Sequence, residues 1–299
     1  MTTESVARPR VTGRRPGAVG QLARMEGRRM LRHPAPWIGL VLMVWWTSGV
    51  VGQQQWSSAD YQNLAVSFAP LLLGVSLASM SAFGREHVPV ADGAPLEPER
   101  RSLARLLGGL PLVGLVAVVV AAGGVWLRVR GGVGLGDEPG HTEHAYFSLP
   151  ELQQPVLLGC LAVGLGAAVV HVVRKRLVAS VVLFLTWFLV GATYWLFSGV
   201  AEWLTPVQVQ PSFVRVGPWD ADPSRFPSDW LLSAPGQYQD YWARMVVSPS
   251  LAAWHDVYLV ALTLLTVAVA VPGRLRRRLL AVGGLLAVGA VLLQATVAP

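Results

Sequence analysis

The chain has little charge for its length. Charged residues make up 14% of its 299 positions, apolar residues make up 53%, and the mean hydropathy is +0.47. This composition is typical of membrane proteins and argues against an ordinary soluble domain. The net charge of +7 does not indicate nucleic-acid binding, because the basic residues stand in short clusters between apolar runs. We therefore expect no nucleic-acid partner.

Lysine and cysteine are almost absent, and each scarcity excludes a class of site. The only lysine, Lys175, has no glycine before it in VVRKRLV, so the chain lacks the P-loop GxxxxGK[ST] of standard nucleotide-binding proteins. The only cysteine, Cys160, lies in an apolar run, so an internal disulfide is excluded. We interpret Cys160 as a small residue that faces lipid or another helix.

Recognisable catalytic motifs are also missing. The sequence has no HExxH, no GxSxG and no CxxC. His141 and His144 in HTEHAYF are chemically able to bind a metal, but a polar loop is the simpler interpretation. No Asp or Glu stands in the middle of an apolar run, which argues against a carrier driven by protons or sodium ions. We expect no catalytic residue, cofactor or metal ion in this chain.

Long apolar runs are the dominant feature of the sequence. Seven of them are candidate spans, at about 36–52, 64–84, 106–127, 155–173, 177–200, 251–271 and 279–297. Each run should be helical, because a bilayer offers no water to bond unpaired backbone groups. We predict an all-α integral membrane protein. It is a polytopic bundle of about six to seven transmembrane helices in residues 36–299, preceded by an N-terminal interfacial helix within residues 1–35.

The distribution of Arg and Lys predicts the orientation. Segments 1–35, 84–106, 174–176 and 273–278 contain 19 of the 24 basic residues, and the other 5 lie in the segments between them. The positive-inside rule therefore places the N-terminus in the cytoplasm. By the same rule, the cluster GRLRRR at 273–278 is a cytoplasmic anchor. The run that follows it, at 279–297, would be a seventh span that ends outside. A re-entrant final segment, with both termini cytoplasmic, is the alternative.

The segment before the first span predicts an interfacial helix. In QLARMEGRRMLRH, at 21–33, helical spacing places Arg24, Arg28 and Arg32 on one face. Apolar side chains, interrupted by Glu26 and Arg29, lie broadly opposite. Such a helix would lie along the inner membrane surface with its arginines toward anionic headgroups. The alternative is a simple positive-inside anchor.

Two connecting segments are too long or too aromatic to be plain linkers. In the cytoplasmic loop 84–105, GREHVPVADGAPLEPERRSLAR, acidic residues precede basic ones from Glu97 onward, which predicts a helix that continues into the third span. A solvated loop without a partner is the alternative. The outer loop 199–254 contains five tryptophans, and we expect short helices at the outer interface or a small folded cap.

Several of these stretches resemble one family. They are EGRRMLRHPAPWIGL before and within the first span, REH after the second span, PERRSLARLLGGLPLVGL entering the third, and WHDVYLVAL in the sixth. Together with the large outer segment, they make the layout similar to the permease subunit of ATP-binding cassette transporters. The similarity is to the type-2 exporter kind, as in actinobacterial permeases. That family usually has six spans, so the seventh run is a departure from it.

The resemblance implies a function and a set of partners. The chain would be a permease in the bacterial plasma membrane that pairs with a second permease copy or a related permease, and with separate ATPase subunits that bind ATP and Mg²⁺. The expected cargo is hydrophobic or amphipathic. The segments implied to touch the ATPase are 21–33 and 85–105. The residues implied as coupling contacts are Arg85, Glu86, Arg100, Arg101 and Arg105.

The competing hypothesis is a polytopic membrane protein without a transport role, such as a sensor, an assembly factor or an anchor for a membrane complex. The absence of a polar pathway within the predicted spans favours it. A membrane enzyme is a third hypothesis, which the lack of a clustered acid, base and nucleophile disfavours.

Overall fold

The structure is a computed structural model. It describes residues 17–53, 55–56, 60–61, 63–87, 96–135, 144–196, 204–207, 209, 212–236, 240–246 and 248–297.

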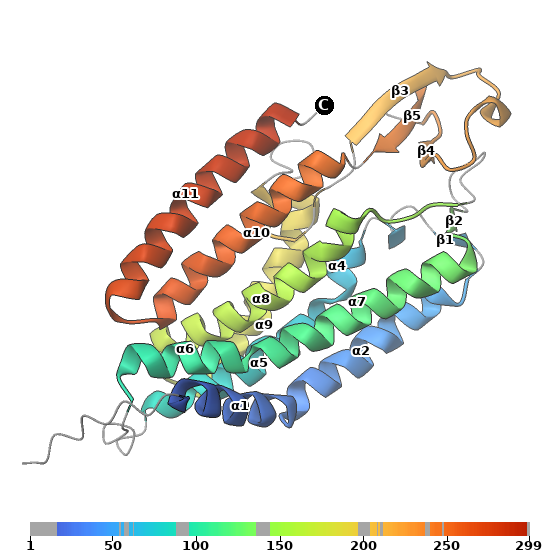
Figure 1. The fold of residues 1–299 in the computed structure, drawn as a ribbon. Coiled ribbons are helices and arrows are strands. Elements are labelled where there is room, and N and C mark those ends of the chain that lie inside the picture. Colours follow the sequence, from blue (N-terminus) through green and yellow to red (C-terminus); the bar gives the residue numbers. More distant parts are fainter. Residues whose placement is uncertain are drawn as a thin grey trace, which may run out of the picture.

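All seven predicted apolar runs form helices that lie alongside one another (Figure 1). They are α2 (Pro34–Val51), α4 with α5 (Leu64–Ser67 and Ala69–Phe83), α7 (Leu110–Arg130), α8 (Leu149–Val172), α9 (Arg176–Leu196), α10 (Pro249–Ala270) and α11 (Gly273–Val297). In the described part of the chain, five helical stretches are long and apolar enough to cross a bilayer, and α5 and residues 176–192 of α9 form shorter apolar helices. The prediction of a mainly helical membrane-embedded protein is therefore confirmed.

The bundle has two chemically different ends. Successive long helices alternate in direction, so the short turns after α8 and α10 lie at the same end as α1 (Ala18–Leu31) and α6 (Pro98–Gly108). We call this the basic end. Its basic residues are Arg24, Arg28, Arg29, Arg32, Arg85, Arg100, Arg101, Arg105, Arg174, Lys175, Arg176, Arg274, Arg276, Arg277 and Arg278. The opposite end carries the strands, and we call it the sheet end.

Helix α8 lies at the centre of the bundle and packs against α5, α7, α9 and α10. Polar groups bond between helices instead of facing lipid. The Ser79 hydroxyl donates to the carbonyl oxygen of Val163 at 2.7 Å, and the Trp187 indole N–H donates to the Ser76 hydroxyl at 2.9 Å. Such bonds join spans in the membrane, where small residues allow close approach.

The C-terminal run is one continuous helix and not a re-entrant hairpin. Helix α11 runs antiparallel to α10 from the basic end to the sheet end (Figure 1). Near the sheet end, His255 on α10 and Gln294 on α11 are completely buried and share a hydrogen bond of 3.0 Å between Nδ1 and Oε1. The seventh helix is thus bonded into the bundle along with the other six.

Several helix boundaries differ from the sequence prediction, including the start of α11 at Gly273 instead of 279, and two of the differences have a clear local cause. The third span starts at Leu110 instead of 106, because α6 ends at Gly108 and a new helix direction begins after Gly109, before Pro111 (Figure 1). The fourth starts at Leu149 instead of 155. Ser148 and Glu151 form a capping box there, which begins the helix before Pro155.

The described part of the outer segment contains a sheet, whereas the sequence left open short interfacial helices or a small folded cap. Strand β5 (Tyr241–Val246) lies between β3 (Ser212–Pro218) and β4 (Leu232–Ser233), and both pairings are antiparallel. A short 3-10 helix, η4 (Pro223–Arg225), connects β3 to β4. The strands β1 (Gln55–Trp56) and β2 (Gly134–Leu135) form a separate parallel pair at the same end. The β-branched and aromatic residues of β3 and β5, such as Val214 and Trp242, favour strands over interfacial helices.

We predict that Gln294→Leu loosens the last turns of α11. The substitution leaves the buried His255 Nδ1 without its partner, which typically costs about 1–3 kcal/mol. Amide hydrogen exchange in the sheet-end half of α11 should become faster than in the wild type. Thr296→Ala is the control, because the Thr296 hydroxyl is exposed and bonds only within its own helix, to Leu293. Equal exchange in all three proteins would show that the bond does not hold α11 in place.

Candidate functional site

Three short elements form a platform at the basic end. They are α1, α6 and η1 (Gly84–His87), the short 3-10 turn that follows α5. Helices α1 and α6 lie side by side, with Gly27 facing Gly108 (Figure 1). A Cβ atom at Gly27 would stand 3.1 Å from the Gly108 carbonyl oxygen, so the two glycines permit this approach. We call these three elements the basic-end platform.

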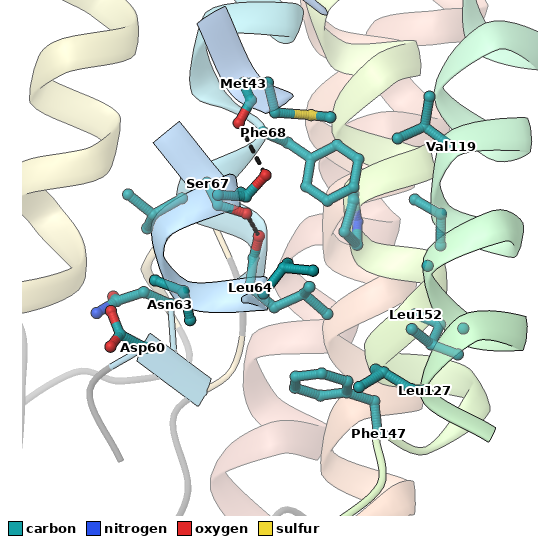
Figure 2. Close-up of a pocket in the computed structure, with 18 of the residues that line it drawn as sticks. Met43, Asp60, Asn63, Leu64, Ser67, Phe68, Val119, Leu127, Phe147 and Leu152 are labelled. Carbon is teal, nitrogen blue, oxygen red and sulfur yellow. Dashed lines mark hydrogen bonds between the residues drawn. The ribbon is translucent and has the colours of Figure 1, made fainter. Parts of the chain in front are cut away.

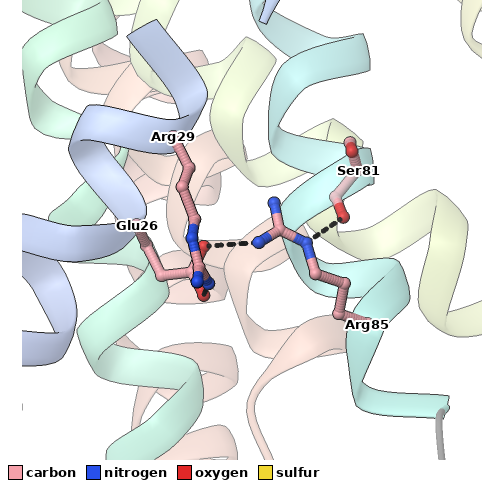
Figure 3. A network of polar contacts seen from close by, with 4 residues as sticks. All are labelled: Glu26, Arg29, Ser81 and Arg85. Carbon is pink, nitrogen blue, oxygen red and sulfur yellow. Dashed lines mark hydrogen bonds and ion pairs between the residues drawn. The ribbon is translucent and has the colours of Figure 1, made fainter. Parts of the chain in front are cut away.

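A buried carboxylate joins α1 to the end of α5. Glu26 is only 3% exposed, and its two oxygens face two different arginines (Figure 3). Its Oε1 accepts a hydrogen bond from Arg29 Nη1 at 3.5 Å, one turn along α1, and its Oε2 lies 3.3 Å from Arg85 Nη1. A charge taken out of water is stable only when it is paired in this way.

Arg85 ties the same carboxylate to the helix before it. Its Nε donates to the Ser81 carbonyl oxygen at 3.3 Å, so the side chain folds back along the end of α5 (Figure 3). Ser81 belongs to α5, Arg85 to η1 and Glu26 to α1, so the network connects α1 to α5. Displacing α1 therefore requires breaking this ion pair or moving α5 as well.

Arg105 ties α6 to the same place. Arg105 is only 7% exposed, and its guanidinium carbon lies 5.9 Å from the centroid of the Phe83 ring at the end of α5. By contrast, Arg100 Nε and Glu97 Oε2 are 3.7 Å apart in an exposed pair, which contributes little to stability. The platform is therefore held by its buried charges and not by its surface pair.

The structure divides the sequence-predicted contact residues into two groups. Arg24, Arg28 and Arg32 are exposed on α1, as a membrane-facing or partner-facing role requires. Arg100 is partly exposed on α6, beside Leu103 and Leu107, which are 38% and 42% exposed.

The second group points inward. Arg85 pairs with Glu26, and Arg105 packs on Phe83, so Arg105 is unavailable as a surface contact in this arrangement. Arg101 is half-buried. Glu86 lies in η1, but its side chain is outside the described part of the chain.

Sequence reasoning missed the role of Glu26. It treated this acid as an interruption of the apolar face of α1, whereas the structure buries Glu26 together with Gly27 and Met30. The available signal was the acid itself, because a lone carboxylate on a buried helix face requires a basic partner from elsewhere in the chain. Nothing in the sequence identified Arg85 as that partner, which lies 59 positions away.

His33 forms the joint between α1 and α2. Its Nδ1 accepts a hydrogen bond of 3.2 Å from the backbone N–H of Ala35, which caps the first turn of α2. Burial lowers the pKa of His33, and the nearby positive charge of Arg85 lowers it further. The neutral ring is therefore the form that the folded joint uses.

The predicted metal-free character of the chain is not tested by the structure. Among the described residues, no group of three His, Cys, Asp or Glu side chains is placed to hold a metal ion. His144 Nδ1 lies 2.9 Å from the Gly131 carbonyl oxygen, and His141 is outside the described residues.

Comparisons with protein-family models, with curated proteins and with solved structures found no match to this chain.

We predict that Glu26→Gln destabilises the platform by about 1–3 kcal/mol, because the neutral amide keeps the shape but loses both ionic contacts. Hydrogen exchange of α1 should accelerate, and the thermal unfolding midpoint should fall. Glu97→Gln is the matched control, since it removes an equal charge from an exposed pair and should change stability by less than about 0.5 kcal/mol. If the two variants behave alike, the buried network does not hold the platform.

We predict that His33 makes the joint weaker at acidic pH. The unfolded chain takes up the proton near the ordinary His pKa of 6.5, whereas the folded chain resists it, so stability falls as the pH decreases below 6.5. His33→Asn keeps a capping acceptor that does not titrate. Between about pH 7.5 and about pH 5.5, the unfolding midpoint of the wild type should fall further than that of His33→Asn. Parallel pH profiles would exclude this role.

Proposed function

We propose that this chain is the membrane-spanning permease subunit of an ATP-binding cassette transporter, of the exporter kind. One observation carries the proposal. Helix α6 lies at the basic end, is joined directly to the long span α7 through Gly109, and exposes Arg100, Leu103 and Leu107 on one side. A charged and apolar surface on a helix continuous with a span is suited to receiving force from a partner.

The packing of the platform supports a coupling role. Force applied to α6 reaches α7 through the chain itself, α1 through the Gly27–Gly108 contact, and α5 through Arg105 and Phe83. The Glu26–Arg85 ion pair makes α1 and α5 move together. The chain has no P-loop of its own, so in this proposal separate ATPase subunits bind ATP and Mg²⁺ and supply that force.

The same proposal includes an orientation in the membrane and a set of partners. The basic end faces the cytoplasm, in keeping with the positive-inside rule, and the N-terminal segment enters from that side. The sheet end faces outward, and α11 ends there as a seventh span. The location is a bacterial plasma membrane, and the complex contains a second permease copy or a related permease.

The cargo class follows from the spans. Their exposed faces are apolar, which suits a hydrophobic or amphipathic substrate. The alternative function is a sensor, an assembly factor or an anchor for a membrane complex. It is favoured by the bonding of Ser76 and Ser79 to partners inside the protein, so that these two hydroxyls are not free to line a polar path.

The test reverses charge on the exposed side of α6. We predict that Arg100→Glu combined with Arg101→Glu weakens copurification of the ATPase roughly tenfold, which corresponds to about 1.4 kcal/mol, or uncouples ATP hydrolysis from transport. The measurement is ATPase recovery with the tagged permease, followed by ATP hydrolysis and cargo export in reconstituted vesicles. Neither arginine takes part in the Glu26 network, so the platform should stay assembled.

The matched control is Arg276→Glu combined with Arg277→Glu, which reverses equal charge at the same end but on α11. Insertion is checked first by labelling Thr296→Cys from outside in a Cys160→Ala background. A correctly inserted Arg100/Arg101 variant that keeps full ATPase binding and full export would exclude α6 as the joint. Failure of any ATPase to copurify with the wild type would favour the alternative function.

A further inference from the structure

A cavity of about 380 Å³ lies in the sheet-end half of the bundle, away from the platform (Figure 2). This volume falls in the range typical of small-molecule sites, roughly 300–1,000 Å³. Helices α2, α4, α7 and α8 all contribute to its wall. The apolar residues labelled in Figure 2 are Met43, Leu64, Phe68, Val119, Leu127, Phe147 and Leu152.

Helix α2 packs most closely on the bundle near the basic end, and the cavity lies beside its other half. Near the basic end, Gly39 of α2 faces Pro70 of α5, and Gly74 of α5 faces Ala35 of α2, so closely that a Cβ on either glycine would collide with a carbonyl group of the other helix. Beyond this crossing, α2 continues toward the sheet end beside α4 and leaves space beside α7. Gly123 and Gly124 of α7 line this space, and a Cβ at Gly123 would have no atom within 4 Å.

The wall is mainly apolar, and its polar side chains include Asp60, Asn63, Thr47 and Ser67. The Thr47 hydroxyl donates to the Met43 carbonyl oxygen at 2.9 Å, and the Ser67 hydroxyl donates to that of Leu64 at 2.6 Å. Both hydroxyls are thus bonded within their own helices. An occupant that gains its binding energy from apolar burial suits this wall better than a polar one.

Aromatic side chains close the cavity toward the sheet end. Trp56 and Phe147 are each 8% exposed, and the Phe147 ring stacks on Tyr61 with centroids 4.2 Å apart. Arg130 Nη1 donates to the Val51 carbonyl oxygen at 3.0 Å, which joins the ends of α7 and α2 above the cavity. Access from the water phase is therefore restricted on this side.

The exposed part of the lining faces outward between α2 and α7. Trp46 is 68% exposed, Trp126 is 36% exposed, and Gly123 is exposed beside them. In a membrane this surface contacts hydrocarbon, and Trp126 near the end of α7 lies at the level where tryptophan meets headgroups. The molecules with direct access to the opening are the surrounding lipids.

We propose that this cavity binds one acyl chain of a phospholipid, which enters sideways between α2 and α7 while its headgroup stays at the membrane surface near Trp126. Lipid binding at this site requires no ATPase and no transport. The test of this proposal is therefore independent of the test of the proposed function.

The test uses the full-length wild-type chain in vesicles of phosphatidylethanolamine and phosphatidylglycerol. These contain a trace of phospholipid with a photoreactive diazirine at the end of one acyl chain. After illumination, peptide mass spectrometry locates the adducts. We expect them to concentrate on inward residues of the cavity, above all Met43, Val119 and Leu152. Adducts spread over the lipid-facing surfaces of α9 and α11, with none on those three residues, would overturn the proposal.

A pair of glycine substitutions on one helix sharpens the test. Gly123→Leu places a side chain in the cavity, whereas Gly114→Leu places the same side chain on the exposed surface of α7, where a Cβ also meets nothing within 4 Å. We expect Gly123→Leu to lower the adduct yield on Met43 roughly tenfold, the scale of a steric change in an apolar pocket, and Gly114→Leu to leave it unchanged.

Val119→Phe fills the cavity from a second position, and the adduct yield on Met43 is measured in the same way. The test therefore does not depend on the folding of a single variant. Folding of each variant is checked by its thermal unfolding midpoint. Wild-type adduct yields on Met43 in folded Gly123→Leu or Val119→Phe protein would overturn the proposal.

Discussion

The arrangement of the basic end depends on one buried charge. Glu26 is carried by an otherwise basic helix into the contact with α5, where water cannot solvate it. Its burial is tolerated because Arg29 and Arg85 approach its two oxygens from different elements. A buried ion pair is weak evidence for net stability, but breaking one is costly, so it acts to specify which elements meet. Here it specifies that α1 docks on the end of the second span.

Glycine contacts determine how far the helices separate elsewhere. Gly27 and Gly108 let α1 and α6 touch, and Gly39 and Gly74 do the same for α2 and α5. In a bilayer there is little hydrophobic drive between helices, so such close contacts supply much of the packing energy. Because α2 has its closest crossing near the basic end, the opposite half of the helix is less constrained. The close packing at one end and the cavity at the other thus have a common origin.

Much of the helical layout could be predicted from the sequence, because long apolar runs and Arg clusters are strong local signals. All seven runs are helices, and the arginine-rich segments lie at one end. The ends of helices were less predictable where a capping interaction determines them. An example is Ser148, which caps the start of α8 before Pro155. The sheet of the outer segment escaped prediction because its aromatic and proline content concealed short alternating strands. The pairing of Glu26 with Arg85 and the burial of Arg105 are long-range outcomes that no local pattern encodes.

Helix α2 is joined to the platform at one end and lines the cavity at the other. At one end, the capped joint at His33 connects it to α1, and at the other end it forms one wall of the cavity beside α7. A rigid helix held closely at the Gly39 crossing transmits displacement between its two halves. If a partner that shifts α1 changes the affinity of the cavity for an acyl chain, the chain must change the affinity for that partner by the same factor. Helix α2 is the element through which such a coupling would pass, because it is joined to α1 at one end and lines the cavity at the other.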